Sequence, residues 1–409
     1  MKNRKSKIIL FLVALCAVSS PTVNAQGGAG FESGSWNLRP YAEVGIAYDD
    51  NVYRSGANEV DDFYFDPKVG LLFTTSPDAT TLKLSGGGYF NRREYMDEDK
   101  SSDSYGGGLS LDLGLGDNTT AQAVGGYRLL EEEDVLGPVT QLKGVNQGLI
   151  QDIDASAIER EVVDVGAIVE HNFSERTSGS VGSIYSFVDY DNPASLDLSG
   201  MIGQFSVDHK LTDKLGVFGL GRAGSQEQDG DNQTADSLAG QAGVSLTPTD
   251  KLKLRAGLGA ESYTRSIPGQ ADKDSDNISY SLILDLQATD KLTLSAGGYN
   301  GTQLSSTFTD NAVDFINSFI GARLEVSDKF DLNLRAVYRQ DDYVDAITRD
   351  DITVERTDDR IQFVLRVNYR PPLDYLKVFA QISTEDVNST VDSIDYVRNL
   401  VLAGVSVAY

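Results

Sequence analysis

Few side chains in this sequence have the types and spacing that catalysis needs. Only two histidines occur, His171 and His209, and the single cysteine is Cys16. Each histidine lies two residues before the end of an expected strand and shares a face with apolar neighbours, which favours an amphipathic interfacial position over a catalytic base. No Gly-x-Ser-x-Gly elbow or zinc-binding pattern occurs. We therefore expect no enzyme and no cofactor, although chemistry by carboxylates at a rim stays open.

Two acidic stretches raise the question of a bound cation. Asp272, Asp274 and Asp276 alternate along the chain, and residues 229–232 read Asp-Gly-Asp-Asn. Ca²⁺ takes six or more oxygen ligands, and neither stretch has the full calcium-loop pattern. We therefore expect solvated acidic loops and no dedicated metal site. Weak bridging of divalent cations to lipid phosphates is the alternative use.

The N-terminus has the pattern of a secretory signal peptide. Basic residues precede an apolar run from Ile8 to Val18, and Val23-Asn24-Ala25 fits a cleavage site. The apolar run is shorter than the ~20 residues of a membrane-spanning helix. Bulky Leu15 before Cys16 disfavours lipid attachment. We expect residues 1–25 to direct Sec-type export and to be removed.

The charge balance excludes one class of partner. Residues 1–25 carry four positive charges and no negative ones, so the formal net charge changes from −26 to −26 − 4 = −30 on cleavage. Nucleic-acid binding depends on Lys and Arg neutralising phosphates. A nucleic-acid partner is therefore not expected.

A four-residue turn recurs along the second half of the chain. Ser/Thr-Asp-Lys followed by Leu or Phe occurs at 212–215, 249–252, 289–292 and 327–330, and Ser174-Glu175-Arg176-Thr177 is a looser copy. A period of 37 to 40 residues fits two strands and one longer loop. The Asp side chain is expected to accept bonds from nearby backbone N–H groups. The motif therefore predicts repeated hairpin turns at one end of a meander.

Alternation of apolar and polar residues predicts eighteen strands and no second domain. Short turns separate them on one side, and mostly longer, polar loops on the other, which is typical of an all-β fold, a transmembrane antiparallel up-and-down β-barrel of the bacterial outer membrane. Residues 26–35 would be a short periplasmic segment and 36–409 the barrel. The expected strands are 36–49, 63–75, 80–92, 103–115, 119–130, 161–173, 177–188, 196–211, 215–225, 236–247, 252–264, 277–288, 292–301, 315–326, 330–340, 359–370, 376–386 and 399–409.

The polar face of each strand predicts what lines the lumen. Because residues i and i+2 share a face, one face of each strand is apolar and suits lipid, while the other carries charges and suits water. A basic patch and an opposed acidic side would produce a transverse field across a pore, with ion pairing as the equal alternative. Inward aromatic rings could form a slide for saccharides, or be ordinary lumen residues. The basic patch is Arg323, Arg335, Arg339, Arg360 and Arg366; the acidic side is Glu43, Asp112, Asp164 and Glu170; the aromatic residues are Tyr41, Tyr89, Phe218, Tyr263, Tyr299 and Phe379. We expect the arginines to favour anions.

The last strand resembles the C-terminal signal that outer-membrane barrels present to the barrel assembly machinery. Val401, Ala403, Val405, Val407 and Tyr409 share one face, and the final residue is aromatic. Gly404, Val407 and Tyr409 match the pattern, whereas Leu402 stands where a polar residue is expected. A strand that simply ends the chain is the alternative.

The segment from Gly45 to Arg54, with Tyr48-Asp49-Asp50-Asn51-Val52-Tyr53 at its centre, resembles the first strand of a known family. It is similar to outer-membrane β-barrel porins that often occur in exopolysaccharide export clusters of Gram-negative bacteria. The resemblance implies a passive pore for small solutes or saccharides, outer-membrane lipid and lipopolysaccharide as surroundings, and polysaccharide export components as partners. The alternative is a structural or surface-interaction barrel with a filled lumen.

The longest connection, from Glu131 to Arg160, is unusually apolar for a loop. Val135, Leu136, Val139 and further aliphatic residues recur at intervals of mostly three or four. We expect it to fold into the lumen as a constriction, or to pack on the rim or against a second protomer.

Overall fold

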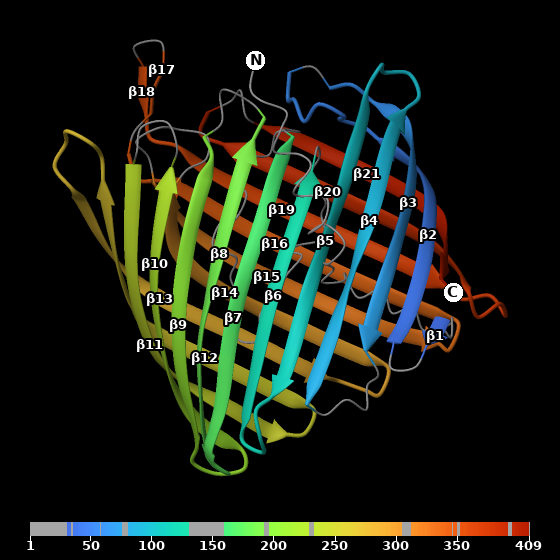
Figure 1. Ribbon diagram of the computed structural model, residues 1–409. Helices are drawn as coiled ribbons and strands as arrows, with labels where there is room; N and C mark the ends of the chain where they lie inside the picture. Colours follow the sequence, from blue (N-terminus) through green and yellow to red (C-terminus); the bar gives the residue numbers. More distant parts are fainter. Residues whose placement is uncertain are drawn as a thin grey trace.

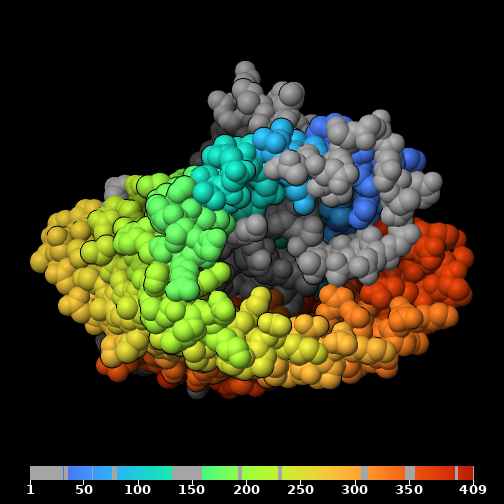
Figure 2. Space-filling view, turned by 90° about the horizontal axis from the view of Figure 1, so that it is seen from below, coloured from blue at the N-terminus to red at the C-terminus, as the bar shows by residue number. Residues whose placement is uncertain are grey.

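The protein folds as a closed antiparallel β-barrel (Figure 1). The computed structural model describes residues 31–33, 36–57, 59–75, 81–130, 159–191, 196–228, 233–304, 312–345, 347–349, 352–391 and 395–408. Within these residues eighteen long strands pair in sequence order, and the last long strand pairs with the first to close the sheet. In the view from below, the colours run in order around a flattened ring, and the blue and red strands lie on the same side (Figure 2). The expected fold class is confirmed.

The long strands are of similar length, mostly 13 to 15 residues. Three short strands add to them: β1 (Phe31–Ser33) pairs with the start of β2, and β17 (Ile347–Arg349) pairs with β18 (Ile352–Val354). The long strands are β2 (Trp36–Asp49), β3 (Asp62–Thr75), β4 (Leu82–Tyr95), β5 (Ser101–Gly114), β6 (Thr119–Leu130), β7 (Arg160–Ser174), β8 (Thr177–Tyr190), β9 (Leu198–Lys210), β10 (Leu215–Gln228), β11 (Gln233–Thr249), β12 (Leu252–Ser266), β13 (Lys273–Gln287), β14 (Leu292–Leu304), β15 (Ala312–Ser327), β16 (Phe330–Tyr343), β19 (Thr357–Tyr369), β20 (Leu376–Ser389) and β21 (Tyr396–Ala408).

Each of the eighteen expected strands corresponds to one long strand of the structure. Two match to the residue, 36–49 as β2 and 119–130 as β6, and the others differ at their ends by up to four residues. The described residues contain no helix that is both long and apolar enough to cross a membrane. The expected signal peptide at 1–25, the loop from Glu131 to 158 and Tyr409 lie outside the described residues.

Four of the five hairpin turns are held by the hydroxyl group, not by the carboxylate that the sequence suggested. Thr212 Oγ1 accepts the backbone N–H groups of Lys214 and Leu215 at 3.2 and 3.0 Å. Thr289 accepts the same two bonds, and Ser327 accepts one, from the N–H of Lys329. Ser174 accepts two such bonds as well, which explains why the looser copy with Glu175 still forms the turn. We call this end of the barrel the turn end, and the other the loop end.

The outer face is apolar and exposed, as a lipid-facing surface requires. On β2, Val44 and Ile46 point outward and are exposed, whereas Ala47 and Asp49 on the inward face are buried. Both histidines point outward at the turn end, where Nδ1 of His171 lies 2.8 Å from Thr119 Oγ1 and Nδ1 of His209 lies 2.9 Å from Thr177 Oγ1. Their outward position beside the turns agrees with their strand phase, and their place at a membrane interface stays a prediction.

Candidate functional site in the barrel lumen

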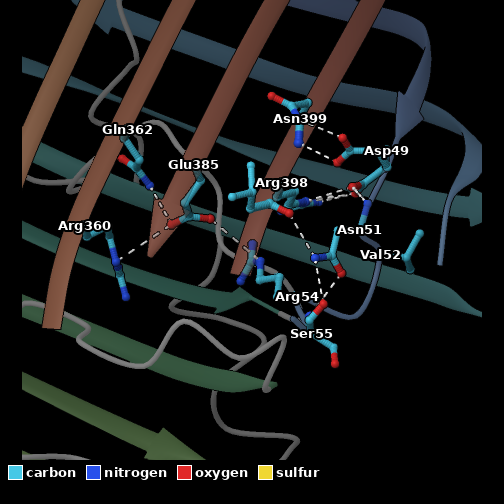
Figure 3. Close-up of polar contacts among 12 residues, drawn as sticks. Asp49, Asn51, Val52, Arg54, Ser55, Arg360, Gln362, Glu385, Arg398 and Asn399 are labelled. Carbon is cyan, nitrogen blue, oxygen red and sulfur yellow. Dashed lines mark hydrogen bonds and ion pairs between the residues drawn. The ribbon is translucent and has the colours of Figure 1, made fainter. Parts of the chain in front are cut away.

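The seam where the barrel closes carries a buried ion pair at the loop end. The β2–β21 ladder runs from Tyr41↔Ala408 to Asp49↔Leu400. At its top, the guanidinium of Arg398 donates to both carboxylate oxygens of Asp49, from Nε at 3.0 Å each (Figure 3). Asp49 is fully buried and Arg398 nearly so. A buried charge pair of this geometry joins the first and last barrel strands through side chains.

Asp50 and Asn51 extend the seam beyond the ladder. Asp50 accepts the backbone N–H and the side-chain amide of Asn399, at 2.6 and 2.7 Å. Asn51 donates from Nδ2 to the carbonyl groups of Ser55 and Val397, at 3.1 and 3.0 Å, and accepts the N–H of Ser55. The segment that carries the family resemblance therefore holds β2 and β21 together at the closing seam. We call Asp49, Asp50 and Asn51, with their partners on β21, the clasp.

Glu385 connects this clasp to the lumen wall. It projects from β20 and accepts a hydrogen bond from Gln362 Nε2 at 3.2 Å (Figure 3). Arg360 lies at 3.9 Å on one side and Arg54 at 4.0 Å on the other. Arg54 has φ 51°, a left-handed conformation that is uncommon for a residue with a side chain. The turn after β2 thereby brings a cation onto the inner wall.

A polar cavity of about 80 Å³ lies beside the clasp, inside the barrel. Its walls come from β2, β3 and β4 on one side and from β19, β20 and β21 on the other. Four cations and three carboxylates line it, together with amide and hydroxyl groups. Asn91 Oδ1 is buried there and has no hydrogen-bond partner among the described residues. The cavity thus offers both donors and acceptors to a solute. Its charged residues are Lys68, Arg93, Arg366, Arg398, Glu43, Asp66 and Glu385.

The residues of the expected basic patch face the lumen, but acids of the same wall neutralise most of them. Arg323 pairs with Glu325 at 3.4 Å, Arg339 with Asp341 at 2.7 Å and Arg360 with Glu385 at 3.9 Å. Arg366 reaches Glu43 at 3.5 Å across the closing seam. Arg335 differs, since it is exposed and has no ion pair or hydrogen bond with another described residue.

The expected acidic side is similarly interleaved with bases. Asp164 lies 3.4 Å from Arg128 on β6 and accepts a bond from Ser186 at 2.6 Å. Asp112 stands opposite Lys83 in the β4–β5 register. Glu170 lies 3.5 Å from Thr120 Oγ1. This arrangement favours the ion-pairing alternative over two walls of opposite charge.

The inward aromatic residues fall into two groups. Phe218, Tyr263 and Phe379 are each at most 5% exposed, so their rings present almost no surface to the lumen. Cations lie over two of them, Arg255 over Phe218 at 3.7 Å and Arg366 over Phe379 at 4.1 Å. Tyr41, Tyr89 and Tyr299 are less buried and remain the ones with surface for a sugar ring. Lys68 lies over the Tyr89 ring at 4.5 Å.

Gly404 and Val407 of the expected assembly signal lie at the closing seam, and Tyr409 lies outside the described residues. Gly404 faces inward opposite Gly45, and a Cβ there would lie 2.4 Å from the Val44 carbonyl oxygen and 2.7 Å from the Phe379 ring. Val407 points outward and is exposed. The glycine is therefore required by close packing at the seam, independently of any recognition by other proteins.

Metal binding finds no support in the described part of the chain. No group of three or more His, Cys, Asp or Glu side chains there is arranged to hold an ion. Asp274 accepts a hydrogen bond from Thr264 at 2.8 Å, and the acidic stretch 229–232 lies outside the described residues.

A closed barrel of eighteen antiparallel strands, with an apolar outer face and a polar lumen, is an outer-membrane architecture. The chain belongs to the family described as "Putative beta-barrel porin 2". The family model matches residues 24–409, nearly the whole chain. As a member of this family, the protein is an outer-membrane β-barrel of a Gram-negative bacterium.

Solved structures that the chain resembles at low sequence identity include three proteins of other bacteria. OccAB4 of Acinetobacter baumannii is 12% identical, with a TM-score of 0.46 over 95% of this chain and 100% of that one. OpdQ of Pseudomonas aeruginosa is 10% identical, with a TM-score of 0.46 over 91% and 98%. The FrpB iron transporter from Neisseria meningitidis is 11% identical, with a TM-score of 0.49 over 88% and 62%. Among curated proteins, none matches the chain.

Sequence reasoning placed the inward residues but missed the clasp. The motif at Asp49, Asp50 and Asn51 served only as a family signature, and Arg398 and Glu385 were not singled out. A signal was available, because adjacent polar residues at the end of an otherwise alternating strand have no place on a lipid-facing surface. Their partners lie 346 to 349 residues away, beyond the reach of local spacing.

Proposed function

We propose that the protein is a passive outer-membrane pore for small polar solutes, with saccharides as the favoured class. The observation that carries this proposal is the cavity beside the clasp, where amides, hydroxyls and paired charges converge around the unsatisfied Asn91 Oδ1. Paired charges present hydrogen-bonding groups with little net charge, which suits hydroxylated solutes better than free ions. The protein would act as a conduit and not as an enzyme.

The cellular setting of this function follows from the N-terminus and the family resemblance. Residues 1–25 would direct Sec-type export, and the barrel assembly machinery would insert the mature chain among lipid and lipopolysaccharide. The link to exopolysaccharide export rests on the resemblance of the clasp motif to porins in such clusters. Solutes would then be saccharides that accompany polymer export, and export components would be partners.

Liposome swelling with sugars of graded size tests the proposed solute class. Proteoliposomes with the parent protein should swell in small sugars faster than empty liposomes. Asn91→Leu should slow swelling in sugars, because it replaces the free acceptor of the cavity with an apolar group. Gln122→Leu is the matched control, since Gln122 faces the lumen from β6, outside the cavity, and donates to Ser110 instead. Equal rates for both variants and the parent would argue against the cavity as the solute site.

A structural barrel with a filled lumen is the second candidate. It is favoured by the buried charge pairs, such as Arg339 with Asp341, and by the buried inward rings. Such a barrel would cause no swelling above that of empty liposomes while migrating as a folded protein on gels.

A further inference from the structure

Strand β13 loses its neighbour halfway along the barrel wall. Its ladder with β12 continues to Arg265↔Lys273, whereas its ladder with β14 stops at Ser281↔Tyr299. On the other side, β14 stays paired with β15 up to Leu304↔Ala312. Residues 273–280 of β13 and 300–304 of β14 are thus extended strands that are not paired with each other. In Figure 1 the hairpin of β12 and β13 stands apart at the left edge.

The loop-end part of β14 instead crosses the inside of the barrel. The Leu304 N–H donates to Gln226 Oε1 of β10 at 2.9 Å. Strands lie about 4.8 Å apart, so β10 and β14 would be roughly 19 Å apart along an unbroken wall. The contact therefore requires β14 to pass over the inner faces of β11, β12 and β13. We call residues 300–304 and 312–315, the paired ends of β14 and β15, the flap.

The flap is seated on the inner wall by apolar packing. Leu304 and Ala312 of the flap form one buried cluster with three residues of the wall. All five are at most 3% exposed. The wall residues are Leu198 of β9, Ala235 of β11 and Tyr263 of β12.

Polar contacts also hold the flap against the inner wall. Asn277, inward on β13, donates from Nδ2 to Thr302 at 3.2 Å and to Asp314 at 3.1 Å. Next to the flap, Asp345 follows β16 and pairs with Arg265 and with Lys273, the latter at 2.9 Å. Burial acts to raise the pKa of Asp345, but the hydrogen bonds from Lys273 and Arg265 outweigh it and lower the pKa.

The side chain of Asn300 covers part of the β13 edge that has no neighbouring strand. Asn300 accepts the Tyr280 N–H at 2.8 Å and donates to the Ile278 carbonyl at 2.5 Å. Its amide replaces one pair of backbone hydrogen bonds between strands, because a carboxamide offers the same donor and acceptor as a peptide group. Continuing the register beyond Ser281↔Tyr299 would align Ile278 with Thr302 and Asp276 with Leu304. The edge of β13 is therefore a template that fits the flap strand.

We propose that the flap is a gate that moves between two positions. In the closed position, which the structure shows, it lies against the inner faces of β10 to β13 and occupies part of the lumen. In the open position, residues 300–304 pair with 276–280 of β13 and the flap joins the wall. The closed position is held by apolar packing and a few side-chain hydrogen bonds. The open position would be held by backbone hydrogen bonds between β13 and β14. As a gate for solutes, this inference rests on the proposed pore function.

Disulfide trapping tests the closed position. In Gln226→Cys/Leu304→Cys, oxidation should hold the flap down, and reduction should raise single-channel conductance at least about twofold, because the cross-section at the narrowest point governs flow. Ser110→Cys/Val124→Cys is the matched control, since it joins neighbours of the permanent β5–β6 wall, and reduction should leave its conductance unchanged. Failure of the first pair to oxidise while the control oxidises, or equal conductance before and after reduction, would overturn the gate.

Hydrogen exchange tests the open position without reference to transport. Leu304→Asp removes the apolar anchor of the flap, so residues 276–280 should exchange their amide protons more slowly as they gain backbone partners. Unchanged exchange there would overturn the open position. If no variant conducts in any redox state, the pore function has failed, and exchange at 276–280 decides alone whether the flap moves.

Discussion

Arg398 and Asp49 form a buried ion pair across the strands that close the barrel, 349 residues apart in the chain. Every other neighbouring pair of long strands is joined by one connection of the chain, whereas β2 and β21 meet only through assembly. The pair lies at the end of their ladder, where backbone bonding stops. It therefore fixes the register of the one junction that chain connectivity does not set.

Breaking this pair should destabilise the closed barrel. Asp49→Ala leaves the Arg398 guanidinium buried without its partner, which costs about 3 to 5 kcal/mol. The temperature at which the folded band converts to the unfolded one on gels should drop markedly. Arg92→Ala is the control, because Arg92 and Glu94 form an exposed pair worth about 0 to 1 kcal/mol. Equal shifts for both variants would contradict the role of the seam pair.

The hairpin turns make a sharper prediction about which atom matters. Thr212→Val removes the hydroxyl that accepts two backbone N–H groups and should cost about 0.5 to 1.5 kcal/mol. Asp213→Ala in the same turn should cost less. Urea unfolding of the two variants in parallel measures the difference. A larger loss for Asp213→Ala would restore the carboxylate as the turn-forming group.

Ion selectivity should depend on Arg335 more than on the other inward arginines. Arg335 is exposed to the lumen, whereas Arg339 is buried against Asp341, so only the first adds an uncompensated charge. Arg335→Ala should lower the preference for anions, as measured by reversal potential in a salt gradient. Arg339→Ala should instead expose the charge of Asp341 and reduce stability. A parent pore whose selectivity is unaffected by Arg335→Ala would rule out this assignment.

Substitutions in the last strand should prevent assembly of the barrel for two separable reasons. Gly404→Val should prevent closure, because its side chain would meet the Val44 carbonyl and the Phe379 ring. Val407→Asp changes only the exposed outer face and tests recognition by the assembly machinery. Refolding in detergent micelles without that machinery should therefore fail for the first variant and succeed for the second. If neither variant refolds in micelles, the result would contradict the separation of barrel closure from recognition by the assembly machinery.

Much of the fold could be predicted from the sequence because strand periodicity is local. Alternation in segments such as Leu252–Ser266, with the Ser/Thr-Asp-Lys turns, located all eighteen long strands and their inward faces. The turn chemistry was only partly right, since the hydroxyl and the carboxylate are adjacent and spacing does not choose between them.

The lumen contacts could not be predicted because closure brings distant residues together. Arg366 and Glu43 are 323 residues apart in the chain and 3.5 Å apart in space, so the sequence could not choose between ion pairing and walls of opposite charge. The flap was also missed, since residues of β14 alternate in the same way whether they lie in the wall or against its inner face. Strand periodicity reports the backbone shape, not the partner.

Single-channel recording of the refolded protein in a planar bilayer tests the central claim, that the lumen is a passive pore. The account predicts discrete current steps that are proportional to voltage, and a concentration-dependent reduction of current by small sugars. It also predicts that Asn91→Leu weakens that block without abolishing the steps. A preparation that is folded by heat-modifiable mobility but gives no current steps would contradict the pore and favour a barrel with a filled lumen.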